Sequence, residues 1–165
     1  MKTLKIFIAL FITSITAAQA QFTKAELQVS GLTCSMCSKA TEKSLRTLDF
    51  IGDIKADLNR NVFMITFKKD APVNLEQISK KVQNAGFFVN NLKATFNFDN
   101  VKVSNNTFNY GGDTYRLVNG AEKTLAGPVM ITVVDKGFAP AAIYKKYSSQ
   151  ANDKVEAGRT YHITI

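Results

Sequence analysis

Hydrophobic and polar residues alternate along the chain from residue 22 onward. Ala25, Leu27 and Val29 are separated by charged or polar residues, which is the period of a half-buried strand. A loop that contains Gly31 follows this strand. The amphipathic pattern that begins near Met36 and runs to about Leu48 then predicts a helix.

The same alternation predicts two further strands that are joined by a tight turn. Ile54, Ala56 and Leu58 alternate with polar residues, and the segment 62–67 is rich in β-branched and aromatic side chains. The residues between them, 59–61, read Asn-Arg-Asn, which is a turn signal. The spacing therefore predicts a hairpin.

A second helix is marked at both of its ends. Asn74 precedes it, and Gln77 stands three positions later, where a capping box places it. Apolar residues recur at helical spacing over 75–85, and Gly86 fits the left-handed stop that follows a last helical turn. A fourth strand is predicted over 87–98.

The predicted order of elements is β-α-β-β-α-β over residues 21–98. This order is the ferredoxin-like split arrangement, in which an antiparallel sheet of four strands carries both helices on one face. The fold class is therefore α+β.

The remainder of the chain, residues 99–165, has a different character. Paired Asn and Gly residues alternate with short segments typical of strands, which are Val101–Phe108, Thr114–Val118, Val129–Val134 and Tyr161–Ile165, and Phe138–Tyr147 is a short candidate helix. We expect a small, mostly β domain whose candidate architecture is a partly open barrel of the OB type. Its core is expected to contain Tyr110, Tyr115, Tyr144 and Tyr147.

The first twenty residues are typical of an export signal. Lys2 and Lys5 precede an apolar stretch of about 13 residues, and 18–20 read Ala-Gln-Ala, which fits the small-x-small cleavage pattern. The apolar stretch is shorter than the roughly 20 residues that span a bilayer. We therefore expect a signal peptide over 1–20, no later membrane span, and a periplasmic or secreted protein that starts near Gln21. A short uncleaved anchor is the alternative.

The charge of the chain is basic but dispersed. The formal net charge is +8, and removing residues 1–20 takes away two of the 21 basic residues and none of the 13 acidic ones, which leaves +6. No basic run with interleaved aromatic residues occurs. We interpret the charge as a solvated surface that attracts anionic partners, and we expect no nucleic-acid partner.

The two cysteines of the chain, Cys34 and Cys37, form a C-x-x-C pair between the first strand and the first helix. A disulfide between them closes almost no loop and so contributes little stability. Thiolates select soft metals such as Cu(I), Ag(I) and Hg(II). Cys37 is expected in the first helical turn, where free N–H groups and the positive helix end lower the pKa of a thiol. The pair is thus predicted to hold one soft ion, with Cu(I) the first candidate.

Other metals and other ligands are less favoured. Structural Zn(II) takes four ligands, and a zinc site here needs carboxylates or a partner to complete it, since His162 is the one histidine. Met36 is expected to point to solvent or to cap the loop, Met64 to lie in the core, and His162 to face solvent or a neighbouring strand.

Residues 22–98 resemble the heavy-metal-associated domain family. This family includes copper chaperones, the N-terminal domains of copper-transporting P-type ATPases and the periplasmic mercury-binding protein. Its motif G-M-T-C-x-x-C corresponds to GLTCSMC at 31–37, with Leu32 at the usual methionine position. The A-G-F that ends the family's second helix corresponds to 85–87.

The resemblance implies that Cys34 and Cys37 are the metal ligands and that Phe87 packs near the metal loop and shields it. Some chaperones carry a lysine at that position, and its charge is absent here, so Lys39 and the helix dipole are expected to compensate the thiolates. Thr33 stands where zinc-selective members tend to have Asp, which favours a monovalent soft ion.

The resemblance further implies a non-enzymatic protein that exchanges its ion with a metal-transporting or metal-receiving partner bearing its own thiolate site. No Ser-His-acid set, pair of catalytic carboxylates or phosphate loop is evident in the sequence. Three alternatives stay open. They are a periplasmic mercury-binding protein, a thiol–disulfide redox protein, and an interaction module in which residues 99–165 carry the role.

Overall fold

The chain folds into eight described strands and three described helices. The computed structural model describes residues 21–99, 101–118, 125–148 and 158–165, so the predicted signal peptide lies outside the described residues. The strands and helices are β1 (Gln21–Ser30), α2 (Ser35–Leu45), β2 (Ile51–Asp57), β3 (Val62–Phe67), α3 (Leu75–Asn84), β4 (Phe88–Asn97), β5 (Thr107–Tyr110), β6 (Asp113–Leu117), β7 (Pro128–Val133), α4 (Ala141–Ser148) and β8 (Thr160–Thr164).

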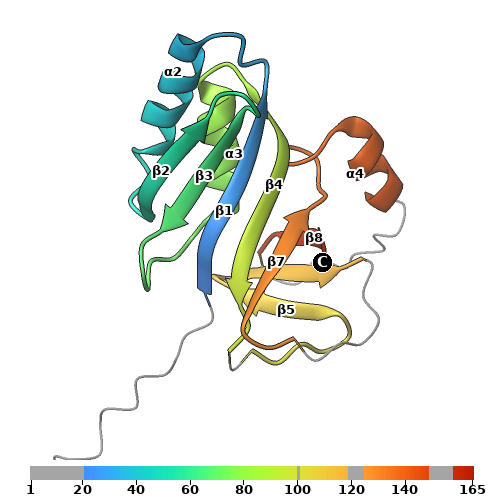
Figure 1. Cartoon of the computed structure of the whole chain (residues 1–165). Coiled ribbons are helices and arrows are strands. Elements are labelled where there is room, and N and C mark those ends of the chain that lie inside the picture. The colour runs from blue at the N-terminus through green and yellow to red at the C-terminus, as the bar shows by residue number, and fades with distance from the viewer. Residues whose placement is uncertain (1–20, 100, 119–124, 149–157) are drawn as a thin grey trace, which may run out of the picture.

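The first six of these elements form the predicted ferredoxin-like unit. Strands β2, β3, β1 and β4 are neighbours in that order, and each adjacent pair is antiparallel. Helices α2 and α3 lie together on one face of these strands, and the other face is open (Figure 1). The hydroxyl of Ser44 on α2 donates to the carbonyl of Lys81 on α3 at 2.9 Å, which joins the two helices. The predicted α+β fold of this part is confirmed.

The caps of α3 explain why its ends were predictable. The side chain of Asn74 accepts a hydrogen bond from the backbone N–H of Gln77 at 3.0 Å, as an N-cap does. At the other end Gly86 adopts a φ of 88°, the left-handed conformation that ends the helix.

Two boundaries differ from the predicted ones. Helix α2 ends at Leu45 instead of near Leu48, although Leu48 is still buried, because a tight turn follows in which the Leu48 N–H donates to the Leu45 carbonyl. Leu58 was predicted in the second strand, but it follows the end of β2 and is 53% exposed in the turn.

The C-terminal strands extend the same sheet. Strand β7 pairs antiparallel with β4, aligning Leu92–Asn97 with Pro128–Val133, and β8, β6 and β5 follow outward to give one sheet of eight strands. The pairing of β6 with β8 is parallel and makes the sheet mixed. The expectation of a separate β domain with an OB-type barrel is therefore wrong for the described residues. Their C-terminal strands continue the sheet from the edge of β4 (Figure 1).

One continuous core joins the two parts. Phe96 on β4 contacts Phe22 on β1 and Phe108 on β5 with ring centroids 4.8 and 4.9 Å apart, and Tyr115 on β6 stacks on Phe108 at 5.0 Å. These four side chains are at most 2% exposed. Such ring pairs add to the hydrophobic gain from burial. The two expected core residues Tyr110 and Tyr115 belong to this cluster, whereas Tyr144 and Tyr147 lie half-buried on α4.

Polar contacts also fasten the C-terminal part to α3. Ser79 on α3 donates to the carbonyl of Gly137 at 2.8 Å, and Arg159 forms an ion pair with Glu76. Among the described residues, none of the helices has the length and the apolar character that crossing a membrane requires.

Candidate metal centre

The loop after β1 places the first cysteine at the end of the sheet. Gly31 has a φ of 88°, a left-handed conformation that other L residues adopt only with strain. A Cβ atom at this position would stand 3.5 Å from the Phe87 ring, so the loop and this ring lie side by side. Leu32 is buried and anchors the loop, whereas Thr33 and Cys34 are exposed. Leu32, which stands at the family's usual methionine position, thus packs into the core beneath the loop.

Cys34 is the N-cap of α2. Its backbone is extended, with φ −150° and ψ 160°, and its sulfur accepts a hydrogen bond from the Cys37 N–H at 3.3 Å. Its carbonyl accepts the Ser38 N–H at 3.2 Å, which is the first hydrogen bond of the helix. A thiol occupies the position that Ser, Thr, Asp or Asn usually takes, so the start of the helix fixes the direction of this sulfur.

The two sulfur atoms converge as predicted. The Sγ atoms of Cys34 and Cys37 are 2.7 Å apart, and both cysteines are free thiols. Cys34 is exposed, while Cys37 is partly buried against the core in the first turn of α2. One sulfur is therefore open to an incoming ion or partner, and the other is held by the protein.

The electrostatics of the helix start favour a thiolate at Cys34. The Cys37 side chain, which hydrogen bonds to its sulfur, is the largest cause that lowers the pKa of Cys34. The backbone N–H groups of Cys37 and Met36 lower this pKa further, against a small opposing effect of burial. The first turn of α2 contains no acidic residue to oppose this effect. The capping geometry thus stabilises a thiolate at Cys34, the residue that precedes the helix.

The two methionines that were weaker candidate ligands are both exposed. Met36 is 76% exposed, as expected. Met64 was expected in the core, but it is 39% exposed, because its neighbours Phe63 and Ile65 on β3 take the buried face. Within the part of the chain that the structure describes, no three His, Cys, Asp or Glu side chains cluster in a way that could hold a metal.

His162 was expected to face solvent or a neighbouring strand, and the structure shows that it does not face solvent. It is 8% exposed, and its Nδ1 lies 2.7 Å from a carboxylate oxygen of Asp135. The other oxygen of Asp135 accepts the His162 backbone N–H at 2.7 Å. This pairing joins β8 to the turn after β7. The alternation of residues within β8 does not reveal it, because Asp135 lies 27 residues earlier in the chain.

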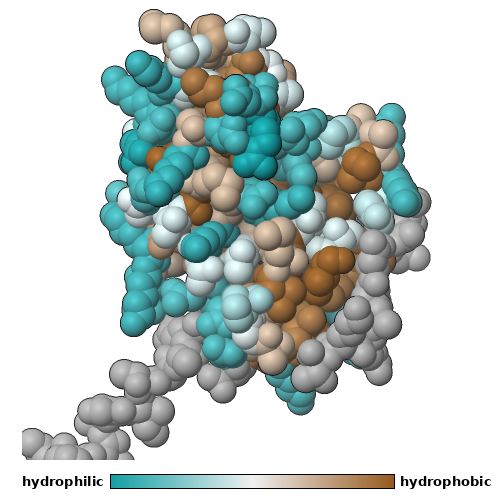
Figure 2. Space-filling model, in the orientation of Figure 1, coloured by the Kyte–Doolittle hydropathy of each residue, from teal (hydrophilic) through white to brown (hydrophobic). Residues whose placement is uncertain are grey.

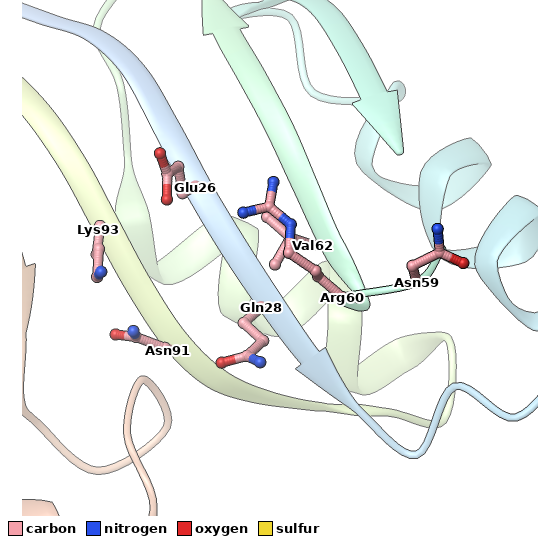
Figure 3. Close-up of a pocket in the computed structure, with 7 residues that line it drawn as sticks. All are labelled: Glu26, Gln28, Asn59, Arg60, Val62, Asn91 and Lys93. Carbon is pink, nitrogen blue, oxygen red and sulfur yellow. The ribbon is translucent and has the colours of Figure 1, made fainter. Parts of the chain in front are cut away.

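A polar pocket of about 450 Å³ lies on the open face of the sheet and does not belong to the centre. Figure 3 shows Glu26, Gln28, Asn91 and Lys93 on neighbouring strands, with Arg60 reaching over them from the β2–β3 turn. Arg60 is held by Asp57, whose carboxylate oxygen is 2.7 Å from its Nε. The lining mixes charges of both signs and has no sulfur, which is typical of a solvated sheet face.

One family model matches the part of the chain that contains the loop with the two cysteines. Residues 26–88 match the family model of the heavy-metal-associated domain. No curated protein matches the chain.

Three solved structures similar to this chain cover about two fifths of it. The copper transporter domain Ccc2a from yeast is 25% identical, with a TM-score of 0.36 over 41% of this chain and 90% of that one. The CopZ metallochaperone is 22% identical, with a TM-score of 0.38 over 41% and 98%. MerP from Ralstonia metallidurans, in its oxidised form, is 22% identical, with a TM-score of 0.35 over 42% and 92%.

Proposed function

We propose that this chain, whose residues 26–88 are a heavy-metal-associated domain, holds one soft metal ion between Cys34 and Cys37 and relays it outside the cytoplasm. The observation that carries the proposal is the convergence of two free sulfurs at the start of α2. Thiolates prefer soft ions, and Cu(I) is the first candidate because it accepts a low coordination number. The apolar stretch before Gln21 supports export.

The unequal exposure of the two cysteines supports transfer by ligand exchange. A thiolate of a partner attacks the two-coordinate ion from the open side, where Cys34 is exposed. A three-coordinate intermediate forms, and one of the two protein sulfurs then leaves the ion. Because few ligands surround the ion, this exchange stays rapid even when the affinity is high.

Zinc is disfavoured by the same geometry. A Zn(II) site takes four ligands, and the two thiols have no third His, Cys, Asp or Glu clustered with them among the described residues. Hg(II) and Ag(I) remain chemical alternatives to Cu(I), because all three ions bind thiolates strongly. The affinity for these ions therefore does not distinguish a copper-binding role from a mercury-binding role. The metal that induces expression of the protein would discriminate those roles.

The proposal is tested by competition between the reduced protein and a chromophoric Cu(I) chelator. We expect the wild-type protein to retain one Cu(I) per chain, and a Cys34→Ser/Cys37→Ser variant to lose it to the chelator. The same assay with a Zn(II) indicator should show much weaker retention of zinc. Equal retention of Cu(I) by the wild type and the double variant would refute the proposal.

A second candidate is dithiol–disulfide exchange. The lowered pKa of Cys34 and the 2.7 Å separation of the sulfurs favour it, because a low pKa makes a thiol a better attacking group at neutral pH. An insulin-reduction assay and a measured reduction potential separate the two candidates. Rapid insulin reduction together with no Cu(I) retention would favour the redox function.

A further inference from the structure

The first residues of β4 offer an unpaired strand edge beside the metal loop. Strand β4 pairs with β1 from Phe88 onward, but β7 joins its other side only from Leu92. Among the described residues, no strand covers that side of the segment 88–91. Figure 1 shows the chain that leaves β7 passing beside this upper part of β4 on its way to α4. An unpaired edge presents backbone N–H and C=O groups that can pair with an added strand.

A pocket of about 320 Å³ lies between this edge and the turn that follows β7. It is lined by Ser30 and Phe88 at the ends of β1 and β4, by Gln83 of α3, and by Gly137, Ala139 and Pro140 of the turn. The C-terminal part of the chain thus builds one wall of it. We name this pocket, together with the edge 88–91, the β4 groove.

Hydrogen bonds fasten the turn that forms one wall of the β4 groove. Ser79 donates to the carbonyl of Gly137 at 2.8 Å and accepts from the side-chain amide of Gln83 at 3.0 Å, which fixes the turn to α3. Phe138 is fully buried, and the Ala139 N–H donates to the carbonyl of Asp135 at 3.1 Å. A surface that is already ordered loses little conformational freedom when it binds a partner.

An apolar side chain marks the entrance to the groove. Phe88 is 69% exposed, while Val89 beside it is buried. A large aromatic side chain in water contributes nothing to folding, but it is a strong anchor when a partner covers it. Phe88 also stands opposite Ser30 in the β1–β4 pairing, directly before the metal loop, so a partner on this groove lies at the same end of β1 as that loop.

The residues that line the pocket are uncharged, and one lysine adjoins its wall in sequence. Lys136 is exposed at the start of the turn, and the residues that line the pocket include no acid. The nearest acidic residue in sequence, Asp135, is engaged by His162. Such a site complements a segment that carries carboxylates.

We propose that the β4 groove binds an extended, acidic segment of the protein that exchanges metal with this chain, by strand addition along 88–91. Strand addition derives affinity from backbone hydrogen bonds and specificity from alternate side chains. The inference rests on the proposed metal relay, since it names the surface on which the partner is held while the ion moves. It also gives the C-terminal strands a role, because their turn forms the wall of the groove.

The test uses NMR titration of the isotope-labelled, metal-free protein with a capped peptide of alternating valine and glutamate. We expect saturable shifts of the backbone amides of 88–91 and Ala139. Methylation of the peptide's backbone nitrogens should weaken binding about tenfold, because it removes the hydrogen bonds along one edge. A peptide with lysine in place of glutamate should bind more weakly still.

Variants separate this proposal from metal binding. Phe88→Ser should weaken the peptide about tenfold, and Lys136→Glu up to about fivefold, with Cu(I) retention unchanged in both. Lys102→Glu, which makes the same charge change beyond the far end of β4, is the matched control and should bind the peptide as the wild type does. The Cys34→Ser/Cys37→Ser variant should bind the peptide normally although it loses Cu(I).

Several results would overturn the inference while leaving the metal site intact. They are the absence of saturable shifts at 88–91, shifts confined to the outer strands β2 or β5, and an equal response to the N-methylated peptide. Because each variant is read by its full spectrum, a fold defect would appear as shifts throughout the protein and is distinguished from loss of the groove.

Discussion

At the scale of single residues, the thiol of Cys34 controls the chemistry of the centre. It is exposed, it caps α2, and hydrogen bonds from Cys37 hold its pKa below the ordinary thiol value. The sequence identified both cysteines from their spacing. It did not indicate which one caps the helix, because sulfur is a rare N-cap and the pattern of the helix was expected to begin near Met36.

The pH dependence of alkylation measures this effect. A lowered pKa means that the thiolate persists to lower pH. The rate of alkylation at Cys34 should therefore rise with pH, and the midpoint of this rise should lie below that of an unperturbed thiol. The rate should fall as the pH drops through that midpoint. In Cys37→Ala the midpoint should move upward, because the largest cause of the shift is removed. It should stay below the ordinary value, since the backbone N–H groups remain.

The modification is followed at Cys34 by mass spectrometry of the iodoacetamide-treated protein. Met36→Leu serves as the control, because it retains both cysteines and the backbone N–H of residue 36, and its midpoint should equal that of the wild type. Identical midpoints in the wild type and Cys37→Ala would contradict the assigned hydrogen bonding.

At the scale of elements, local signals predicted both ends of α3, the helix that packs beside α2. Asn74, Gln77 and Gly86 bracket α3 within one turn of each end, and the structure places them as predicted. Met64 shows a different limit. Its outward direction follows from the alternation of Phe63 and Ile65, but assigning a methionine to the core by residue type alone overrides that pattern and is wrong here.

Removing the cap of α3 should lower stability by a predictable amount. Asn74→Ala leaves the Gln77 N–H without its acceptor, and we expect a loss of about 1 kcal/mol in the free energy of unfolding. Denaturation by urea measures this difference. Asn74→Asp retains a capping oxygen and should cost much less, and equal losses in the two variants would show that the cap is not the cause.

At the scale of the whole molecule, the strands of the described residues form one sheet over one core. The pairing of β4 with β7 joins strands about thirty residues apart, and local periodicity contains no information on such a pair. The contact of His162 with Asp135 is hidden for the same reason. The ferredoxin-like unit also contains a distant pairing, of β1 with β4, but its order of elements matches a known arrangement that implies this pairing. The C-terminal strands follow no such order, so their place was not predictable.

The shared core is tested by Phe96→Ala in the full chain. This side chain is fully buried between rings from both parts, so its loss should cost about 3–5 kcal/mol in the free energy of unfolding. Met130 is 48% exposed on the adjacent strand β7, and Met130→Ala should cost less than about 0.5 kcal/mol.

Figure 2 shows hydrophobic residues on this open face mixed with hydrophilic ones, as expected for a surface.

The same core predicts the behaviour of a shortened chain. A protein that ends at residue 98 would expose Phe22 and Phe96 where Phe108 and Tyr115 now cover them. We expect it to be markedly less stable than the full chain in guanidinium unfolding. Equal stability of the two would contradict a shared core and would favour two independent units.

The central claim is that Cys34 and Cys37 together hold the metal ion. X-ray absorption at the copper edge of the Cu(I)-loaded protein tests it directly, because it identifies the atoms bound to the ion. We predict a first shell of two sulfur atoms per copper, with the sulfur contribution lost in the Cys34→Ser/Cys37→Ser variant. A first shell of nitrogen or oxygen in the wild type, or sulfur ligation that persists in the double variant, would contradict the account.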